Sequence, residues 1–206
     1  MDLLKQVGNL KQGKIKETID KRIQEFKELG KKSNEELFKE LCFCILTANF
    51  NAERSILIQS KIGNDFITLS REGLAKKLEK LGHRFPNARA KYIVEAREHI
   101  DCLKDLITDC NEIEVREWLV KNVKGLGYKE ASHFLRNIGF DNVAIIDFHI
   151  VGLLNNSGLF ECKRPSCKAK YFEIEGVLRK LAKKLDFTLA ELDLYLWYIE
   201  TGKVLK

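Results

Sequence analysis

The stretch KGLGYKEASHFLRNIG, residues 124–139, decides the fold of this 206-residue chain. A helical pattern precedes it over residues 114–123 (EVREWLVKNV), and a second one begins at about residue 128. The short segment KGLG must therefore reverse the chain between two helices. Gly125 and Gly127 permit a positive φ at two alternate positions, which a very tight turn needs. We predict a helix, a glycine hairpin and a second helix.

The hairpin also predicts a site for an anion. The backbone amides of the turn and of the following helix N-terminus point in one direction, which suits a phosphate group. The basic residues Lys121 and Lys124 stand beside the turn. An ordinary connection between two helices is the alternative, because a Gly-x-Gly pair alone is not specific.

Lys129 stands in the first turn of the second helix, where a positive charge is unfavourable. The helix N-terminus carries roughly half a positive elementary charge. That environment, together with a partly dry interface, favours the neutral amine over the ammonium. A neutral amine can attack an electrophilic carbon and form a Schiff base. The alternative is a solvated surface lysine.

Asp147 is a second unusual residue, because it is the lone acid within the apolar run NVAIIDFHIVGLL. Burial of an unpaired carboxylate is costly, so we expect Asp147 to cap a helix that starts at Phe148. A capped carboxylate keeps its charge. At a cleft it can stabilise positive charge that develops on a sugar ring, or accept a proton from an amine.

Helical periodicity dominates the rest of the chain, and no segment alternates convincingly over the length of a strand. Ser33 and Glu36 form a capping signature before an apolar helix that we expect to be central. Thr188 and Glu191 repeat that signature. Further helices are predicted over residues 14–30, 52–62, 71–81, 87–106, 112–123, 148–154, 169–185 and 189–199. We therefore predict an all-α fold.

Composition restricts the classes of protein that remain. The chain has 45% hydrophobic residues and a net charge of +6, which is compatible with a polyanionic partner. We find no apolar run near the length of a membrane span and no apolar signal stretch at the N-terminus. The six cysteines form no Cys-x-x-Cys pair, which excludes zinc-ribbon and thioredoxin-like motifs. Cys162 and Cys167 would bridge if oxidised, but we expect free thiols.

A glycine hairpin followed by Lys129, with Asp147 eighteen residues later, resembles the helix-hairpin-helix DNA glycosylases of the endonuclease III superfamily. The resemblance implies that Gly125, Gly127 and Lys124 contact DNA phosphates. It also implies that Lys129 attacks C1′ of the damaged nucleotide while Asp147 assists. Members that carry this lysine have lyase activity, which monofunctional glycosylases generally lack.

Further motifs narrow the resemblance. The segment TANFNAER, residues 47–54, resembles the part of 8-oxoguanine glycosylases in which an asparagine fills the gap left by the flipped base. Asn49 matches that asparagine, and Arg54 matches the arginine that reads the opposite cytosine; a polar loop with a helix cap is the alternative. With LCFCILTAN and HRFPNARAKYIVEAR, nearly the whole chain is similar to the archaeal-type Ogg group of small 8-oxoguanine DNA glycosylase/AP lyases.

That group implies how the lesion is recognised. 8-Oxoguanine has an N7–H donor where guanine has an acceptor, so an acceptor placed there rejects guanine. The resemblance makes Lys206 the candidate, through either its side chain or a free carboxylate. Trp197 would stack on the flipped base, or else be a core tryptophan. Phe85 would wedge into the duplex or stack near the opposite base, with Arg84 beside it, or pack under a loop.

The resemblance also implies an architecture and its cofactors. We expect two helical lobes with the active-site cleft between them, residues 35–136 forming one lobe and residues 1–34 with 137–206 the other. No iron–sulfur cluster is expected, because only Cys162 and Cys167 lie in the C-terminal part. The backbone of Val123 and Leu126 matches the positions that hold a monovalent Na⁺ or K⁺ ion in this superfamily.

The expected function is that of a bifunctional DNA repair enzyme. Lys129 would displace 8-oxoguanine from duplex DNA through a Schiff base at C1′, and β-elimination would cut the strand 3′ to the abasic site. We expect a monomer in the cytoplasm, associated with the nucleoid and not with a membrane. The alternatives are a helix-hairpin-helix DNA-binding module without chemistry, or a glycosylase/lyase for another oxidised base.

Overall fold

The computed structural model describes residues 3–161, 165 and 167–206, and within them all regular structure is helical. This confirms the predicted all-α fold. None of the described helices has the length and apolar character of a membrane-spanning helix. The elements are α1 (Leu3–Lys11), α2 (Ile15–Gly30), α3 (Asn34–Thr47), α4 (Ala52–Ile62), α5 (Asp65–Thr68), α6 (Arg71–Lys80), α7 (Pro86–Ala96), the 3₁₀ segment η1 (Arg97–Cys102), α8 (Leu103–Asp109), α9 (Glu112–Asn122), α10 (Tyr128–Asn137), α11 (Phe148–Asn156), α12 (Lys168–Leu185) and α13 (Leu189–Thr201).

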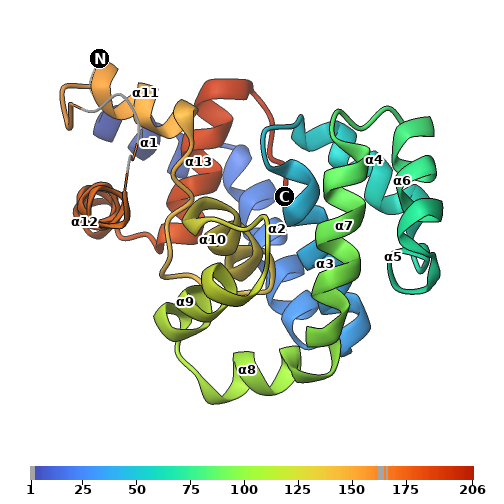
Figure 1. Ribbon diagram of the computed structural model, residues 1–206. Helices are drawn as coiled ribbons and strands as arrows, with labels where there is room; N and C mark the ends of the chain where they lie inside the picture. Colours follow the sequence, from blue (N-terminus) through green and yellow to red (C-terminus); the bar gives the residue numbers. More distant parts are fainter. Residues whose placement is uncertain (1–2, 162–164, 166) are drawn as a thin grey trace.

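Two hydrophobic cores organise these helices. One core draws its buried residues from Leu37 to Val143, and the other from the segments 3–26 and 144–196. Figure 1 shows α4–α7 on one side of the molecule, α1, α11 and α12 on the other, and α10 between them. Helix α1 contacts α12 and α13, so both ends of the chain join the second core. The predicted lobe boundaries stay a prediction.

Helix α3 is the centre of the first core, as its apolar sequence predicts. From Leu37 to Thr47 every residue except Lys39 is buried. Its N-cap Ser33 accepts a hydrogen bond from the Glu36 amide at 3.5 Å. The Glu36 carboxylate binds Lys39 instead of reaching back, so half of the predicted capping box is present. The box of Thr188 and Glu191 before α13 is complete.

The predicted single helix over residues 87–106 is wrong, because it is three elements. Helix α7 ends at Ala96, a 3₁₀ segment follows, and α8 starts at Leu103. The cause lies in another helix. Asn34 of α3 accepts a hydrogen bond from the Lys104 amide at 2.7 Å and so caps the first turn of α8. No local pattern in residues 87–106 could have indicated this break.

The hairpin between α9 and α10 uses its two glycines differently. Gly125 has a φ of +89°, and a Cβ there would lie 2.6 Å from Cδ2 of Tyr92. Gly127 has a φ of −97° and is the extended N-cap residue of α10. The expectation of a positive φ at both positions is therefore wrong for Gly127. The tight turn needs a left-handed conformation only once, at Gly125.

The segment 143–146 has no regular secondary structure, passes from the first core to the second and leads to Asp147. Polar groups of α12 fix its backbone. Glu175 accepts from the Ala144 amide at 3.0 Å, and the Tyr171 hydroxyl donates to the Ala144 carbonyl at 2.7 Å. The buried guanidinium of Arg116 donates to the same Glu175 carboxylate, at 2.5 Å. This network determines where Asp147 enters the cleft.

Candidate active site

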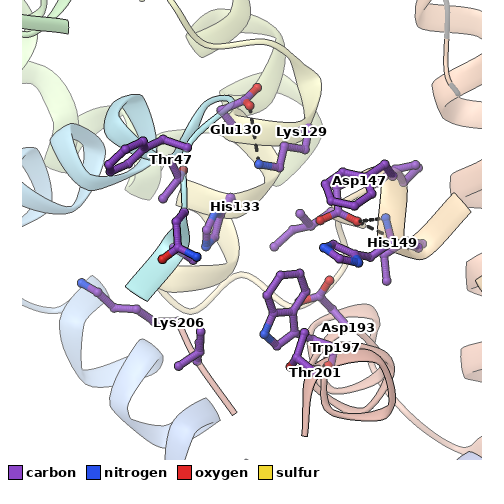
Figure 2. Close-up of a pocket in the computed structure, with 18 of the residues that line it drawn as sticks. Thr47, Lys129, Glu130, His133, Asp147, His149, Asp193, Trp197, Thr201 and Lys206 are labelled. Atoms are coloured by element: carbon purple, nitrogen blue, oxygen red, sulfur yellow. Dashed lines mark hydrogen bonds and ion pairs between the residues drawn. The ribbon is translucent and has the colours of Figure 1, made fainter. Parts of the chain in front are cut away.

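A cavity of about 1160 Å³ opens between the two cores. Its wall is formed by residues next to the first core, by residues of α10 and by residues next to the second core. Figure 2 shows Lys129 and His133 of α10 on one side, with Asp147, His149 and Trp197 across from them. The cavity lies where the cleft between lobes was expected. Among the predicted site residues, those that line it are Asn49, Arg84, Lys129, Asp147, Trp197 and Lys206.

Lys129 occupies the first turn of α10, and its amine is loosely held. The nearest carboxylate oxygen belongs to its sequence neighbour Glu130, 3.6 Å from Nζ. At that distance the two groups form an ion pair but no short hydrogen bond. The other Glu130 oxygen accepts from the Gly127 amide at 3.3 Å, so the same carboxylate also caps the helix. The side chain of Lys129 is 26% exposed, on the cavity wall.

Asp147 is the N-cap of α11, as predicted. Its Oδ1 accepts from the amides of His149 and Ile150 at 2.9 and 3.0 Å. Two amide donors and the positive end of the helix stabilise the charged carboxylate. Figure 2 shows the carboxylate turned toward the cavity that Lys129 also lines. The cavity therefore brings together an amine and a carboxylate.

Lys206 reaches the same cavity from the C-terminal segment, but its amine is tightly held. Nζ donates to Glu40 at 2.7 Å and to Gln59 at 2.5 Å, and lies 4.4 Å from the centroid of the Phe43 ring. Glu40 also accepts from Asn137 at 2.6 Å. We call Lys206, Glu40 and Gln59 the C-terminal clamp. It ties the end of the described chain to α3 and α4.

Trp197 forms part of the cavity wall, so it is not a purely internal core residue. Its indole is half-buried and meets the His149 ring edge-on, with centroids 5.2 Å apart. The indole Nε1 is buried and has no hydrogen-bond partner among the described residues. An aromatic face beside an extruded base is the geometry that stacking requires.

The structure places the predicted opposite-strand residues in two groups. Asn49 and Arg84 line the cavity, and Asn49 has a φ of +56° that turns the chain before α4. Arg54 and Phe85 do not line it. Arg54 lies over the Phe50 ring at 5.6 Å, and Phe85 contacts the guanidinium of Arg84 at 5.0 Å. Their contacts with DNA stay predictions.

The hairpin residues lie outside the cavity wall. Lys124 is exposed and its Nζ is 3.1 Å from Glu95. The Val123 carbonyl accepts from the Leu126 amide at 3.3 Å. A phosphate on Gly125, Gly127 and Lys124 and a monovalent cation at Val123 and Leu126 both stay predictions. Among the described residues, no cluster of His, Cys, Asp or Glu could hold a metal ion. Cys167 is an exposed free thiol, as expected, and Cys162 lies outside the described residues.

Sequence reasoning missed the residues that surround the predicted ones. Glu40 and Gln59 stand far from Lys206 in the sequence, and nothing local marks them. His133 offered a signal, because it stands four residues after Lys129 and therefore on the same helix face. The structure buries its ring in the cavity wall, with 7% exposed.

Residues 19–187 match the profile of the family described as Ogg-HhH, 8-oxoguanine DNA glycosylase. The chain belongs to this family. The match confirms the resemblance of this chain to the 8-oxoguanine DNA glycosylases.

Curated relatives within the 8-oxoguanine DNA glycosylase family cover the whole chain. The 8-oxoguanine DNA glycosylase/AP lyase of Methanocaldococcus jannaschii is 56% identical over 208 residues, which span 100% of both chains. That of Korarchaeum cryptofilum is 55% identical over 207 residues, 100% of this chain and 98% of its own.

Solved structures of the family agree with the fold. The M. jannaschii enzyme in complex with a 15mer DNA containing 8-oxoguanine superposes with a TM-score of 0.96, at 55% identity and with 99% of each chain covered. The Thermotoga maritima 8-oxoguanine DNA glycosylase gives a TM-score of 0.94 at 43% identity, covering 99% of this chain and 98% of that one.

Proposed function

We propose that this chain is a bifunctional 8-oxoguanine DNA glycosylase and AP lyase. One observation carries the proposal: a loosely held amine, Lys129, and a charged carboxylate, Asp147, line one cavity large enough for an extruded base. Its family membership and its relatives with this activity support it. A DNA-binding module without chemistry would need neither group in a cavity, and so explains the site less well.

The reaction begins with DNA binding and base extrusion. Basic side chains and the hairpin amides at Gly125 and Gly127, with Lys124 beside them, contact phosphates of the duplex. The C1′ atom and the base edges are inaccessible in the stack, so the damaged nucleotide must turn out into the cavity. Asn49 and Arg84 at the cavity wall, with Arg54 and Phe85 farther out, face the gap and the opposite base.

Lys129 then acts as the nucleophile. Its neutral amine attacks C1′, the bond from C1′ to the base breaks, and the base leaves with a proton. Asp147 stabilises the positive charge that develops on the sugar ring as this bond breaks. The C1′–O4′ bond of the sugar then opens and O4′ takes a proton, which leaves an imine between Lys129 and C1′. This imine loses a proton from C2′, and the 3′ phosphate leaves by β-elimination. Water finally releases the amine of Lys129. The strand is cut 3′ to the lesion.

Two residues that line the cavity are placed to contact the lesion. Trp197 presents its half-buried indole for stacking, and Lys206 presents a positive charge. The ammonium of Lys206 can only donate hydrogen bonds, and Glu40 and Gln59 already accept two of them. We infer that its side chain shapes the cavity and does not itself accept from N7–H. We further propose that the enzyme works as a monomer without an iron–sulfur cluster, in the cytoplasm at the nucleoid.

Borohydride trapping tests the proposal. A duplex containing 8-oxoguanine is incubated with the protein and with Lys129→Gln, and borohydride reduces any imine to a stable adduct. We expect a covalent protein–DNA adduct only with the lysine protein, and little adduct on a matched guanine duplex. Absence of an adduct with DNA binding intact would leave a binding module or a monofunctional glycosylase. A parallel panel with thymine glycol and uracil decides whether another base is the preferred substrate.

A further inference from the structure

The hydroxyl of Tyr171 on α12 is buried beside the segment that carries Asp147. It donates to the Ala144 carbonyl at 2.7 Å and accepts from the Ile146 amide at 3.3 Å. Both backbone groups lie within three residues of Asp147. The segment 143–146 belongs to no helix, so no helical hydrogen bonds hold it in place. One side chain therefore binds this segment twice, immediately before the carboxylate.

The same hydroxyl also reaches the helix that carries Lys129. It lies 3.4 Å from Oγ of Ser132, which is fully buried and stands three residues after Lys129 on α10. Figure 2 shows Lys129 and Asp147 on facing sides of the cavity. Tyr171 thus contacts both elements that carry the groups proposed to react, α10 and the segment that ends at Asp147.

A buried ion pair supports this arrangement from α9. The guanidinium of Arg116 has no exposed surface and donates to both carboxylate oxygens of Glu175, at 2.5 and 3.1 Å. It also donates to Oγ of Ser132 at 3.2 Å, while Glu175 accepts from the Ala144 amide at 3.0 Å. Such a pair resists displacement, because removal of either partner leaves an unpaired buried charge. The network therefore joins α9, α10 and α12 to the segment before Asp147.

Tyr171 has the properties of a fixed contact. Burial raises the pKa of its hydroxyl far above the ordinary value, so the group stays protonated and keeps its donor hydrogen. A hydroxyl has one donor hydrogen and two acceptor lone pairs, and its three partners match this capacity. Tyr171 does not line the cavity. Any effect of its hydroxyl on the reaction must therefore act through the residues that it holds.

We propose that Tyr171 is a positioning residue of the reaction, whose hydroxyl sets the position of the Asp147 carboxylate relative to the Lys129 amine. This inference rests on the proposed function. Asp147 can stabilise the positive charge that develops on the sugar only while it faces the carbon that Lys129 attacks. A displacement of about 1 Å can lower a rate about 100-fold. A tyrosine with a purely structural role would affect the stability of the fold and leave this alignment unchanged.

The test separates DNA binding from the rate of reaction. Tyr171→Phe removes only the hydroxyl and keeps the ring, which packs against the Tyr128 ring with centroids 5.5 Å apart. We expect single-turnover excision of 8-oxoguanine at saturating protein to fall about 10- to 100-fold. The dissociation constant for the 8-oxoguanine duplex, measured in a Lys129→Gln background, should change by less than about threefold.

Tyr128→Phe is the matched control, because it removes a hydrogen-bonded hydroxyl from the same aromatic cluster. The Tyr128 hydroxyl donates to Glu117 of α9 at 2.9 Å, and not to the segment before Asp147. Tyr128→Phe should change the excision rate by less than about threefold. Thermal unfolding verifies that each variant is folded at the assay temperature.

A double-mutant cycle with Asp147→Asn shows whether Tyr171 acts through Asp147. If it does, Tyr171→Phe should slow excision by less than about threefold once the charge of Asp147 is gone. An equal loss in both backgrounds, a loss confined to the dissociation constant, or an undiminished rate in Tyr171→Phe would overturn the inference. Should Tyr171→Phe fail to fold, Ser132→Ala removes only the contact with α10 and should slow excision about 3- to 10-fold, again only while Asp147 is present.

The two proposals fail in different ways. If the unaltered protein forms no borohydride adduct on the 8-oxoguanine duplex, the proposed function fails, and this inference fails with it. If the adduct forms and Tyr171→Phe excises 8-oxoguanine as fast as the unaltered protein, the role of Tyr171 alone is wrong.

Discussion

The start of α10 and the C-terminal clamp each bring a lysine to the same cavity, yet they hold it in opposite ways. The Lys206 amine has short hydrogen bonds to Glu40 and Gln59 and an aromatic ring beneath it. The Lys129 amine has one carboxylate, at 3.6 Å. The exposed fractions of the two side chains are similar, 26% for Lys129 and 19% for Lys206. Burial alone therefore does not distinguish them.

The difference in hydrogen bonding bears on which lysine we expect to react. An amine must lose its proton and move to a carbon atom before it can form an imine. Lys206 would have to break two hydrogen bonds and leave the buried Glu40 carboxylate unpaired, which is costly. Lys129 would give up only its 3.6 Å contact with the Glu130 carboxylate. From these partners we expect Lys129 to be the reactive lysine of the cavity and Lys206 to be a structural one.

Exchange of each lysine for arginine tests this separation most strongly. Arginine keeps the positive charge and cannot form an imine. Lys129→Arg should lower the rate of adduct formation on an abasic-site duplex by 10³-fold or more, on the order expected for loss of a nucleophile. Lys206→Arg should change it by less than about tenfold, or about 1.4 kcal/mol in the barrier. Single-turnover borohydride trapping measures both, and similar losses would contradict the comparison.

Asp147→Asn should have the next largest effect. Asparagine caps helices as well as aspartate does, so the melting temperature should stay within about 4 °C of the original. The loss of the charge opposite Lys129 should slow excision of 8-oxoguanine by about 10²- to 10⁴-fold. Single-turnover excision and thermal unfolding provide the two readouts. Asp147→Ala, the control, should cost about 1 kcal/mol more in stability because it also removes the cap. An undiminished excision rate in Asp147→Asn would exclude a catalytic charge.

Glu40→Gln tests how much the C-terminal clamp contributes to stability. Glu40 is 2% exposed and accepts hydrogen bonds from Lys206, Gln59 and Asn137. A glutamine would turn a donor toward some of these donors, so we expect a loss of about 1–3 kcal/mol in the free energy of unfolding by urea.

The exposed Glu36 supplies the control for the clamp. It pairs with Lys39 at 2.6 Å but is half exposed, so Glu36→Gln should cost less than about 1 kcal/mol. If the two variants lose equal stability, the clamp is no stronger than a surface ion pair. The 8-oxoguanine dissociation constant, measured alongside, reports whether the position of Lys206 shapes the cavity.

The comparison also explains what the sequence could predict. Lys129 and Asp147 can be identified from the local sequence. Lys129 places a positive charge at a helix N-terminus, and Asp147 places a negative charge within an apolar run; both placements are unfavourable. The caps at Ser33 and Thr188 follow from spacing in the same way. The clamp joins residues 166 positions apart, and the break before α8 depends on Asn34 in another helix. Such long-range contacts exist only once the chain has folded.

The smallest expected effect concerns His133, which lies between the two lysines. Burial and the charges of Arg136, Lys129 and Lys206 keep its folded pKa well below the ordinary 6.5. An unfolded chain takes up a proton near pH 6.5, so between that pH and the lower folded pKa the unfolded state binds more protons. The stabilisation is fully present above about pH 6.5 and is lost as the pH falls toward the folded value, at up to about 1.4 kcal/mol per pH unit.

Urea unfolding from about pH 7 to about pH 5 should therefore show a falling free energy of unfolding, and His133→Gln should flatten that slope. His83 is the control, because burial lowers its pKa less strongly; His83→Gln should flatten the slope by a smaller amount. If the dependence of the free energy of unfolding on pH persists in His133→Gln and disappears in His83→Gln, the expectation is wrong. The His133 ring, between the two lysines, would then take up a proton as readily as in the unfolded chain. The two lysines would then be separated by a third cation instead of a neutral ring.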